Sequence, residues 1–283
     1  MARTDDEGRD LVEVAPGVHV VTAVRYTTTS TVLVAADGTC VVVDPALTAA
    51  EVAGLAREVR RRGWTPVAGF ATHPHWDHVL WHEGLGDVPR WATAACVATA
   101  ERERGPLVRS AADDGTGHDP ATVARLTPLD AVAGACGGPV ADRTTTEGDV
   151  LLPWAAREVV VVPYAAHAPG SAALVVPDTG VLVAGDVLSD LEIPLLDDAA
   201  AEPLADYRAT LDTLEAAAQR YAVRVLVPGH GHVTDAAGLR ERLAADRAYL
   251  DALSGGRTPE DPRLADPWLR GEHARQLAAL ATR

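Results

Sequence analysis

A short segment of the chain gathers side chains that bind metals. His73, His75, Asp77 and His78 lie within six residues of one another and follow the apolar run Val67–Ala71. Imidazole nitrogens and carboxylate oxygens suit Zn²⁺, and the lack of a cysteine nearby argues against a thiolate-rich structural zinc site. Because the apolar run is typical of a buried strand, the segment predicts a metal site on a loop at the end of that strand.

Three later motifs carry residues of the same kinds, each after an apolar, strand-like run. They are Ala166–Gly170 with His167, Ala184–Asp186, and Pro228–Gly231 with His230. In this order, and together with the first segment, they resemble the motifs of the metallo-β-lactamase-fold superfamily, over roughly Val20 to Val233. The resemblance implies the α/β (α+β) fold of that superfamily, a four-layer αββα sandwich.

The resemblance also implies a role for each of these residues in a dinuclear metal centre. The first metal would be bound by His73, His75 and His167, and the second by Asp77, His78 and His230. Asp186 would bridge the two metals. Asp44, which ends an early strand-like run, matches an acidic residue that supports the site by orienting a ligand.

Such a centre is suited to hydrolysis. Two divalent cations about 3.5 to 4 Å apart lower the pKa of a shared water toward about 7, so that a metal-bound hydroxide is available. The expected cofactor is two Zn²⁺ per chain, with Fe or Mn as possible replacements, and Asp77 is the candidate catalytic residue that steers the nucleophile or passes its proton to the leaving group.

A bridging Asp186 resembles glyoxalase II-like thioesterases, lactonases and phosphodiesterases more than true β-lactamases. We therefore expect a hydrolase of a carboxylic ester, a lactone or a thioester. Two alternatives stay open, namely a phosphodiesterase of the same superfamily and an oxidoreductase that resembles the persulfide dioxygenases, which hold a single iron with two histidines and one aspartate.

Further residues near these motifs are candidates for a substrate pocket. Trp76 and Trp81 flank the ligands and could form an apolar wall, whereas His82, Glu192 and His232 lie close in sequence to ligand positions. Each of them also fits a structural or surface role.

The order of the elements predicts two similar halves with helices outside. β-Branched and apolar runs predict strands at Gly17–Ala23, Thr31–Ala36, Thr39–Val43, Val67–Ala71, Val150–Leu152, Glu158–Val162, Ala172–Val176, Val181–Ala184 and Val223–Val227. Helical spacing predicts helices at Leu47–Arg62, Val79–Leu85, Leu204–Tyr221, Ala236–Leu253 and Pro267–Ala281. A strand and a helix are also expected before Arg104. We expect one domain over 1–283, with a lid or insertion at about 105–146 and a C-terminal helical extension at about 236–283.

Composition limits the partners and the location. The formal net charge is −15, spread along the chain, which disfavours nucleic acid because phosphate backbones need basic patches. Three scattered cysteines form no disulfide framework, and Met1–Asp10 lacks the features of a signal peptide. No apolar run approaches the roughly 20 residues of a membrane helix. These features predict a cytoplasmic protein that acts on a small molecule without nucleic acid or membrane; they say nothing about its oligomeric state.

Overall fold

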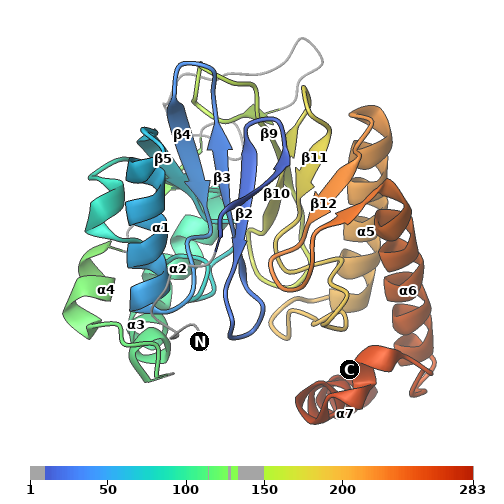
Figure 1. The fold of residues 1–283 in the computed structure, drawn as a ribbon. Coiled ribbons are helices and arrows are strands. Elements are labelled where there is room, and N and C mark those ends of the chain that lie inside the picture. Colours follow the sequence, from blue (N-terminus) through green and yellow to red (C-terminus); the bar gives the residue numbers. More distant parts are fainter. Residues whose placement is uncertain (1–9, 114, 127–128, 133–149, 283) are drawn as a thin grey trace, which may run out of the picture.

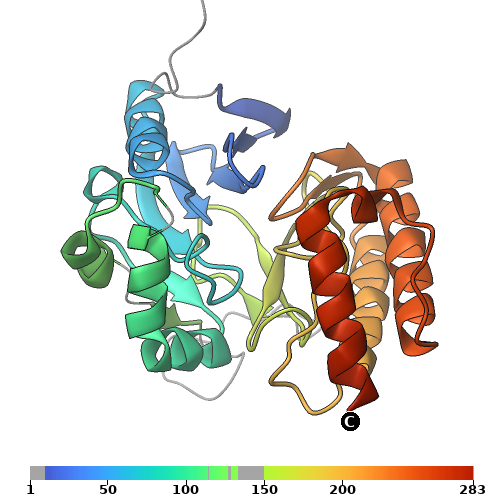
Figure 2. The ribbon, with the colours of Figure 1, turned by 90° about the horizontal axis from the view of Figure 1, so that it is seen from below.

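The computed structural model describes residues 10–113, 115–126, 129–132 and 150–282. Two β-sheets face each other and helices cover both outer faces, so that the chain forms four layers (Figure 1). Seen from below, the two groups of helices lie on opposite sides of the paired sheets (Figure 2). This arrangement confirms the predicted αββα sandwich.

The first sheet contains seven strands in sequence order. The first four strands pair antiparallel and the following ones parallel. The strands are β1 (Val12–Ala15), β2 (Val18–Thr22), β3 (Thr29–Val34), β4 (Thr39–Val43), β5 (Thr65–Phe70), β6 (Arg90–Ala92) and β7 (Asp130–Ala131). Because β4 and β5 are parallel, their carboxyl ends meet at one edge, where the amide of Asp44 donates to the carbonyl of Phe70 (3.0 Å).

Among the described residues the second sheet has six strands, of which only β11 and β12 pair in parallel. In spatial order they are β13 (Thr234–Asp235), β12 (Val225–Val227), β11 (Val181–Val183), β10 (Ala172–Val176), β9 (Val160–Pro163) and β8 (Val150–Leu151). Two backbone hydrogen bonds connect the ends of the two sheets. The amide of Ala172 donates to Thr72 O (2.9 Å), and the amide of Thr29 donates to Gly229 O (2.7 Å).

Four helices accompany the first sheet, and three accompany the second in the part of the chain that the structure describes (Figure 1). The first group is α1 (Ala49–Arg61), α2 (Ala94–Arg102), α3 (Arg104–Asp113) and α4 (Pro120–Leu126). The second group is α5 (Pro203–Arg220), α6 (Ala236–Ser254) and α7 (Pro267–Ala281), with short 3₁₀ turns η1 (Glu83–Leu85) and η2 (Pro262–Ala265) elsewhere. No described helix is long and apolar enough to cross a bilayer.

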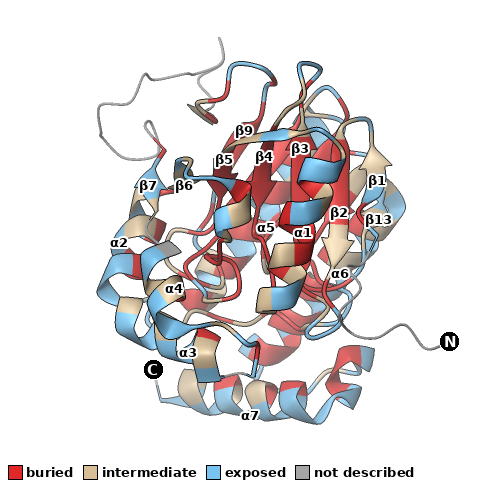
Figure 3. Cartoon of the chain, turned by 60° about the vertical axis from the view of Figure 1, so that its left-hand side comes forward, coloured by how far each residue is buried: buried red, intermediate tan, exposed pale blue. Residues whose placement is uncertain are grey.

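Alternation along the strands creates the layers of the core. In β4, Val41 and Val43 point between the sheets, while Cys40 and Val42 pack toward α1. Likewise β10 places Leu174 between the sheets and its neighbours toward the helices of the second half. Both faces of these strands are therefore buried, as Figure 3 shows in red, and their apolar runs are continuous for that reason.

Two predicted segments need comment. The predicted helix Val79–Leu85 is wrong, since only the turn η1 is helical there. Val79, Leu80 and Trp81 are consecutive, yet each packs in a different apolar cluster, which a single helical face does not allow. Of the predicted lid or insertion, α3, α4 and β7 are described, whereas residues 133–149 lie outside the described part. The predicted C-terminal extension forms α6, η2 and α7, whose leucines join the apolar cluster of α5.

Candidate metal centre

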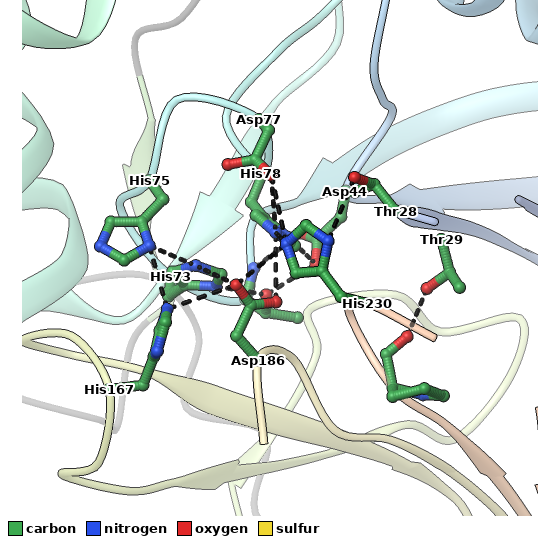
Figure 4. Close-up of polar contacts among 12 residues, drawn as sticks. Thr28, Thr29, Asp44, His73, His75, Asp77, His78, His167, Asp186 and His230 are labelled. Carbon is green, nitrogen blue, oxygen red and sulfur yellow. Dashed lines mark hydrogen bonds and ion pairs between the residues drawn. The ribbon is translucent and has the colours of Figure 1, made fainter. Parts of the chain in front are cut away.

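The seven histidines and aspartates that the sequence predicts as metal ligands come together where the two sheets meet (Figure 4). Potential ligand atoms form two groups, each within 4.8 Å, and each able to hold a metal ion by its donor types. One group is His73, His75, His167 and Asp186; the other is Asp77, His78 and His230. All seven predicted ligand positions therefore converge from loops that are far apart in the sequence.

The ends of strands position these residues. The segment with His73, His75, Asp77 and His78 follows β5, His167 follows β9, Asp186 follows β11 and His230 follows β12. Two backbone features accompany this convergence of the side chains. His167 has a positive φ of 70°, which costs energy for a non-glycine residue. At Gly229 a Cβ would lie 2.0 Å from Asp186 Oδ1, so only glycine leaves room for that carboxylate.

The first group brings three imidazole nitrogens close together. His75 Nδ1 lies 3.0 Å from both His73 Nε2 and His167 Nε2. Burial lowers the pKa of His73 well below its ordinary value despite the nearby Asp186, and burial together with His167 lowers the pKa of His75 to about 4. Both rings are thus neutral at pH 7, which is the form that binds a metal.

Hydrogen bonds around the first group define which nitrogen of His73 faces the centre. Thr72 Oγ1 donates to Asp44 Oδ2 (2.6 Å), and it therefore accepts from His73 Nδ1 at 3.1 Å. The proton of a neutral His73 then lies on Nδ1, and the lone pair of Nε2 points toward His75, His167 and Asp186.

The second group is oriented in the same way. His78 Nδ1 donates to Asp44 Oδ2 (2.9 Å), and His230 Nδ1 donates to the carbonyl of Tyr26 (2.9 Å). The Nε2 atoms of the two rings face each other at 3.4 Å and lie 3.5 and 3.3 Å from Asp77 Oδ2. Asp44 thus fixes the orientation of the His78 ring.

The charges in the second group depend on the carboxylates. Burial opposes a charge on His78 and His230, but Asp186 and its acidic neighbours outweigh burial and raise both pKa values well above the ordinary histidine range. Burial would raise the pKa of Asp77, yet His78 and His230 hold it well below its usual value. A positive charge is therefore favoured between these side chains, whether protons or a metal ion supply it.

The buried polar atoms of the site test whether it fits a metal. Among the described residues, Asp186 Oδ1 is a buried carboxylate oxygen without a hydrogen-bond partner, whereas the unpartnered His167 Nδ1 lies on the far side of its ring from the ligand group. A carboxylate oxygen left in this state is costly in the absence of a cation. Together with the converging neutral imidazoles, this arrangement fits a metal-ion cofactor.

The candidate pocket residues separate into two sets. Trp76 and Glu192 line a cavity of about 910 Å³ that also exposes His75, Asp77, His167, Asp186 and His230. Trp81 does not: it is buried against α1, its Nε1 donates to Gly86 O (3.0 Å), and its ring lies over Gly69. The pocket-wall prediction for Trp81 is thus corrected, because a neighbour in sequence on an irregular loop can point away from the site.

The remaining two histidines also lie outside the lining of that cavity. His82 Nδ1 accepts from the amide of Gly84 (2.9 Å) and begins the turn η1. His232 is exposed, and its Nδ1 lies 2.8 Å from Asp190 Oδ2. His232 therefore acts on the cavity only through Asp190, which does line it.

Several lining residues were not anticipated from the sequence. Tyr26, Asp190, Arg263 and Trp268 all contribute to the cavity. Of these, only Asp190 has a sequence signal, since it follows Asp186 by four residues; the others approach from the first strands and from the C-terminal helices through tertiary packing.

The fold and the ligand groups define a metal-binding αββα protein, and the comparisons give its family. Residues 24–230 match the model of the metallo-beta-lactamase superfamily. The chain belongs to that superfamily, whose members use metal ions and are typically metal-dependent hydrolases. No curated protein matches the sequence.

Solved structures share the fold at low sequence identity. A beta-lactamase domain protein from Burkholderia ambifaria is 21% identical, with a TM-score of 0.62, over 96% of this chain and 86% of that one. A metallo-beta-lactamase from Erythrobacter litoralis is 15% identical with a TM-score of 0.55, over 83% and 94%. A structure of TMB-1 is 13% identical with a TM-score of 0.53, over 84% and 96%.

Proposed function

We propose that the chain is a zinc-dependent hydrolase of carboxylic esters, lactones or thioesters, with two Zn²⁺ per chain. The observation that carries this proposal is the position of Asp186 between the two ligand groups (Figure 4). Its Oδ2 lies 3.3 Å from the Nε2 atoms of His73, His167 and His230, and its Oδ1 lies 3.2 Å from His78 Nε2. A carboxylate with both groups in reach is suited to bridge two metals.

The cations would supply a hydroxide nucleophile near neutral pH and polarise the scissile carbonyl. The chain itself supplies the positioning. Asp77 Oδ2, next to His230 Nε2, borders the cavity and is placed to accept a proton and return it to the leaving group. Asp44 and the carbonyl of Tyr26 hold His78 and His230 so that their Nε2 atoms face the candidate metal centre.

Metal content and activity test the proposal together. The purified protein should contain about two zinc ions per chain, and a chelator should abolish turnover of a lactone and a thioester, with recovery after zinc is added. Equal rates with and without chelator would overturn the mechanism. One iron per chain with oxygen consumption would favour the persulfide dioxygenase alternative, and faster turnover of bis-p-nitrophenyl phosphate than of any carbonyl substrate would favour the phosphodiesterase.

The variant Asp186→Asn tests the bridge. Replacing one carboxylate oxygen by an amide NH₂ removes a ligand from one group, so we expect the metal content to fall to about one ion per chain and kcat/KM to fall at least about 100-fold. Glu241→Gln on the exposed face of α6 changes the net charge equally and should alter neither quantity. A full metal content with normal activity in Asp186→Asn would refute the bridging role.

A further inference from the structure

The cavity over the ligand groups has room for more than the reacting bond. Its volume of about 910 Å³ lies within the usual range for small-molecule sites. The candidate ligand residues border one part of it, and the rest is walled by the loop between β2 and β3, the loop after β5, the loop after β11, η2 and the start of α7. A substrate held at the centre therefore places its non-reacting end against these walls.

Aromatic and aliphatic side chains make up much of this wall. Trp76 comes from the loop after β5 and Trp268 from the first turn of α7, and Trp268 is 56% exposed. Leu191 and Leu195 complete the apolar surface between them. Indole faces attract cations through their quadrupole, and tryptophan does so best among the aromatic residues.

The wall offers no available positive charge to an anion. Among the described residues that line the cavity, Arg263 is the only arginine, and its side chain is 5% exposed. Its Nη1 donates to Ser189 O, Glu192 O and Asp246 Oδ1, while Nε and Nη2 donate to Asp261. Arg263 is thus occupied in holding the wall together.

Three carboxylates beyond the candidate ligands border the cavity, and they differ in their partners. Asp190 binds His232 and Arg242, and Asp266 accepts the amides of the first turn of α7. The backbone of Glu192 is fixed by Ser189 and Arg263, but no described residue donates a hydrogen bond to its carboxylate. Glu192 is therefore the cavity carboxylate without a described donor; burial raises its pKa, and a bound cation would favour its charged form.

We propose that Glu192, Trp76 and Trp268 form a subsite for an ammonium group on the non-reacting end of the substrate. The carboxylate supplies the opposite charge and the indoles supply the faces that an alkylated ammonium packs against. This inference rests on the proposed function for the reacting bond, and it adds the class of substrate: cationic esters, lactones or thioesters rather than anionic ones. An anionic end would meet Glu192 without a cation to offset it.

Binding of an unreactive cation tests the subsite independently of turnover. Phenyltrimethylammonium and its neutral isostere tert-butylbenzene would be titrated into the zinc-loaded protein and followed by tryptophan fluorescence. We expect the cation to bind at least about 10-fold more tightly. Benzenesulfonate, with the opposite charge, should bind more weakly than either. Equal affinity for the cation and its isostere, or tighter binding of the sulfonate, would overturn the proposal.

Variants at the proposed subsite test which residues contribute to cation binding. Glu192→Gln and Trp268→Ala should each weaken phenyltrimethylammonium binding about 10-fold, since each removes one element of the subsite. Glu192→Gln should leave tert-butylbenzene binding unchanged, and Glu241→Gln should leave both unchanged. Cation binding that survives Glu192→Gln at full strength would refute the assignment.

A matched pair of esters connects the subsite to catalysis. Acetylcholine and 3,3-dimethylbutyl acetate differ only in the charge of the distal group, and the wild type should favour the first by about 10-fold in kcat/KM. Glu192→Gln should lower the ratio of the two kcat/KM values to about one, whereas Glu241→Gln should leave that ratio at about 10. If neither ester is cleaved although the cation binds as expected, simple acetate esters are excluded as substrates and the cation subsite is upheld.

Discussion

Asp44 organises the residues behind the candidate metal centre. Its Oδ1 accepts the amide of Thr72 (2.8 Å), and its Oδ2 accepts Thr72 Oγ1 (2.6 Å) and His78 Nδ1 (2.9 Å). It is buried and has a positive φ of 48°, an uncommon conformation for a residue other than glycine. One carboxylate therefore sets the orientation of His78 and, through Thr72, that of His73.

Asp44→Asn should weaken metal binding without removing a ligand. An amide can direct only one oxygen to these donors, so His78 loses its fixed tautomer, and we expect the zinc affinity to fall roughly 10- to 100-fold. Competition with a chromophoric chelator would measure it. Asp37→Asn is the matched control, since Asp37 lies in an exposed turn and accepts from Thr39; equal zinc affinity in wild type and Asp44→Asn would contradict the prediction.

The described cysteines should be inert in the native protein. Cys40 and Cys96 are fully buried, and burial raises the pKa of Cys40 to about 12 and that of Cys96 still further. Because the thiolate is the reactive form, iodoacetamide at pH 8 should leave both unmodified, as judged by peptide mass spectrometry. The same treatment in guanidinium should modify both, and native labelling of Cys40 would show that β4 opens readily.

At this scale the sequence predicted which seven side chains come together, but it did not predict most of the other residues that line the cavity. Each ligand lies in a local motif at the end of an apolar strand, so its position follows from the strand that precedes it. Which residues line the cavity depends on tertiary packing. Trp81 is adjacent to the ligand loop yet points into the core, whereas Trp268 is distant in sequence yet lines the cavity.

Among the elements, α1 shows how a few residues define a helix. Thr48 Oγ1 accepts the amide of Glu51 (3.1 Å), and Glu51 Oε2 accepts the amide of Thr48 (3.0 Å), which is a complete capping box. The helix ends before Gly63, which has a φ of 75°. The predicted limits Leu47–Arg62 therefore differ from the observed ones by at most two residues.

Thr48→Ala should lower the free energy of unfolding by about 1 kcal/mol, because the amide of Glu51 loses its cap and the Glu51 carboxylate loses the hydroxyl of Thr48. Urea denaturation would measure the change. Thr213→Ala on the exposed face of α5 is a suitable control, since Thr213 Oγ1 bonds only to Ala209 O within its own helix; a loss of the same size in both variants would argue against a capping effect.

Elements without such local signals were missed. The strands β1 and β13 are short and lie at the edges of their sheets, where a pairing partner rather than a run of apolar residues defines the strand. The helix predicted at Val79–Leu85 is wrong for the opposite reason. Its apolar residues suggested a helix, but they are divided among separate apolar clusters.

Across the whole molecule, Arg157 connects the two halves. It lies between β8 and β9, and its guanidinium donates to the carbonyls of Pro16, Gly17 and Val34 of the first half (2.9 to 3.0 Å). It also pairs with Asp178 (2.9 Å) in the second half. The Arg157 side chain is 7% exposed, whereas that of its partner Asp178 is 60% exposed, so the guanidinium is the buried member of the pair.

Arg157→Met should destabilise the protein by about 3 kcal/mol, since three carbonyls lose a charged donor in a buried setting. Thermal and urea unfolding would both report it. Arg247→Met, which breaks exposed pairs with Asp212 and Glu215, should cost less than about 1 kcal/mol. Equal losses for the two variants would show that Arg157 contributes no more than a surface ion pair.

The carbonyl of Tyr26 holds His230, and the ligand groups themselves draw on both halves: His167 belongs with residues from the loop after β5, and His230 with Asp77 and His78. Neither half alone carries either complete group. During refolding, capture of the ion would consequently mark the moment at which the halves dock, and the timing of zinc uptake in a stopped-flow experiment would report on assembly of the molecule rather than on formation of its separate sheets.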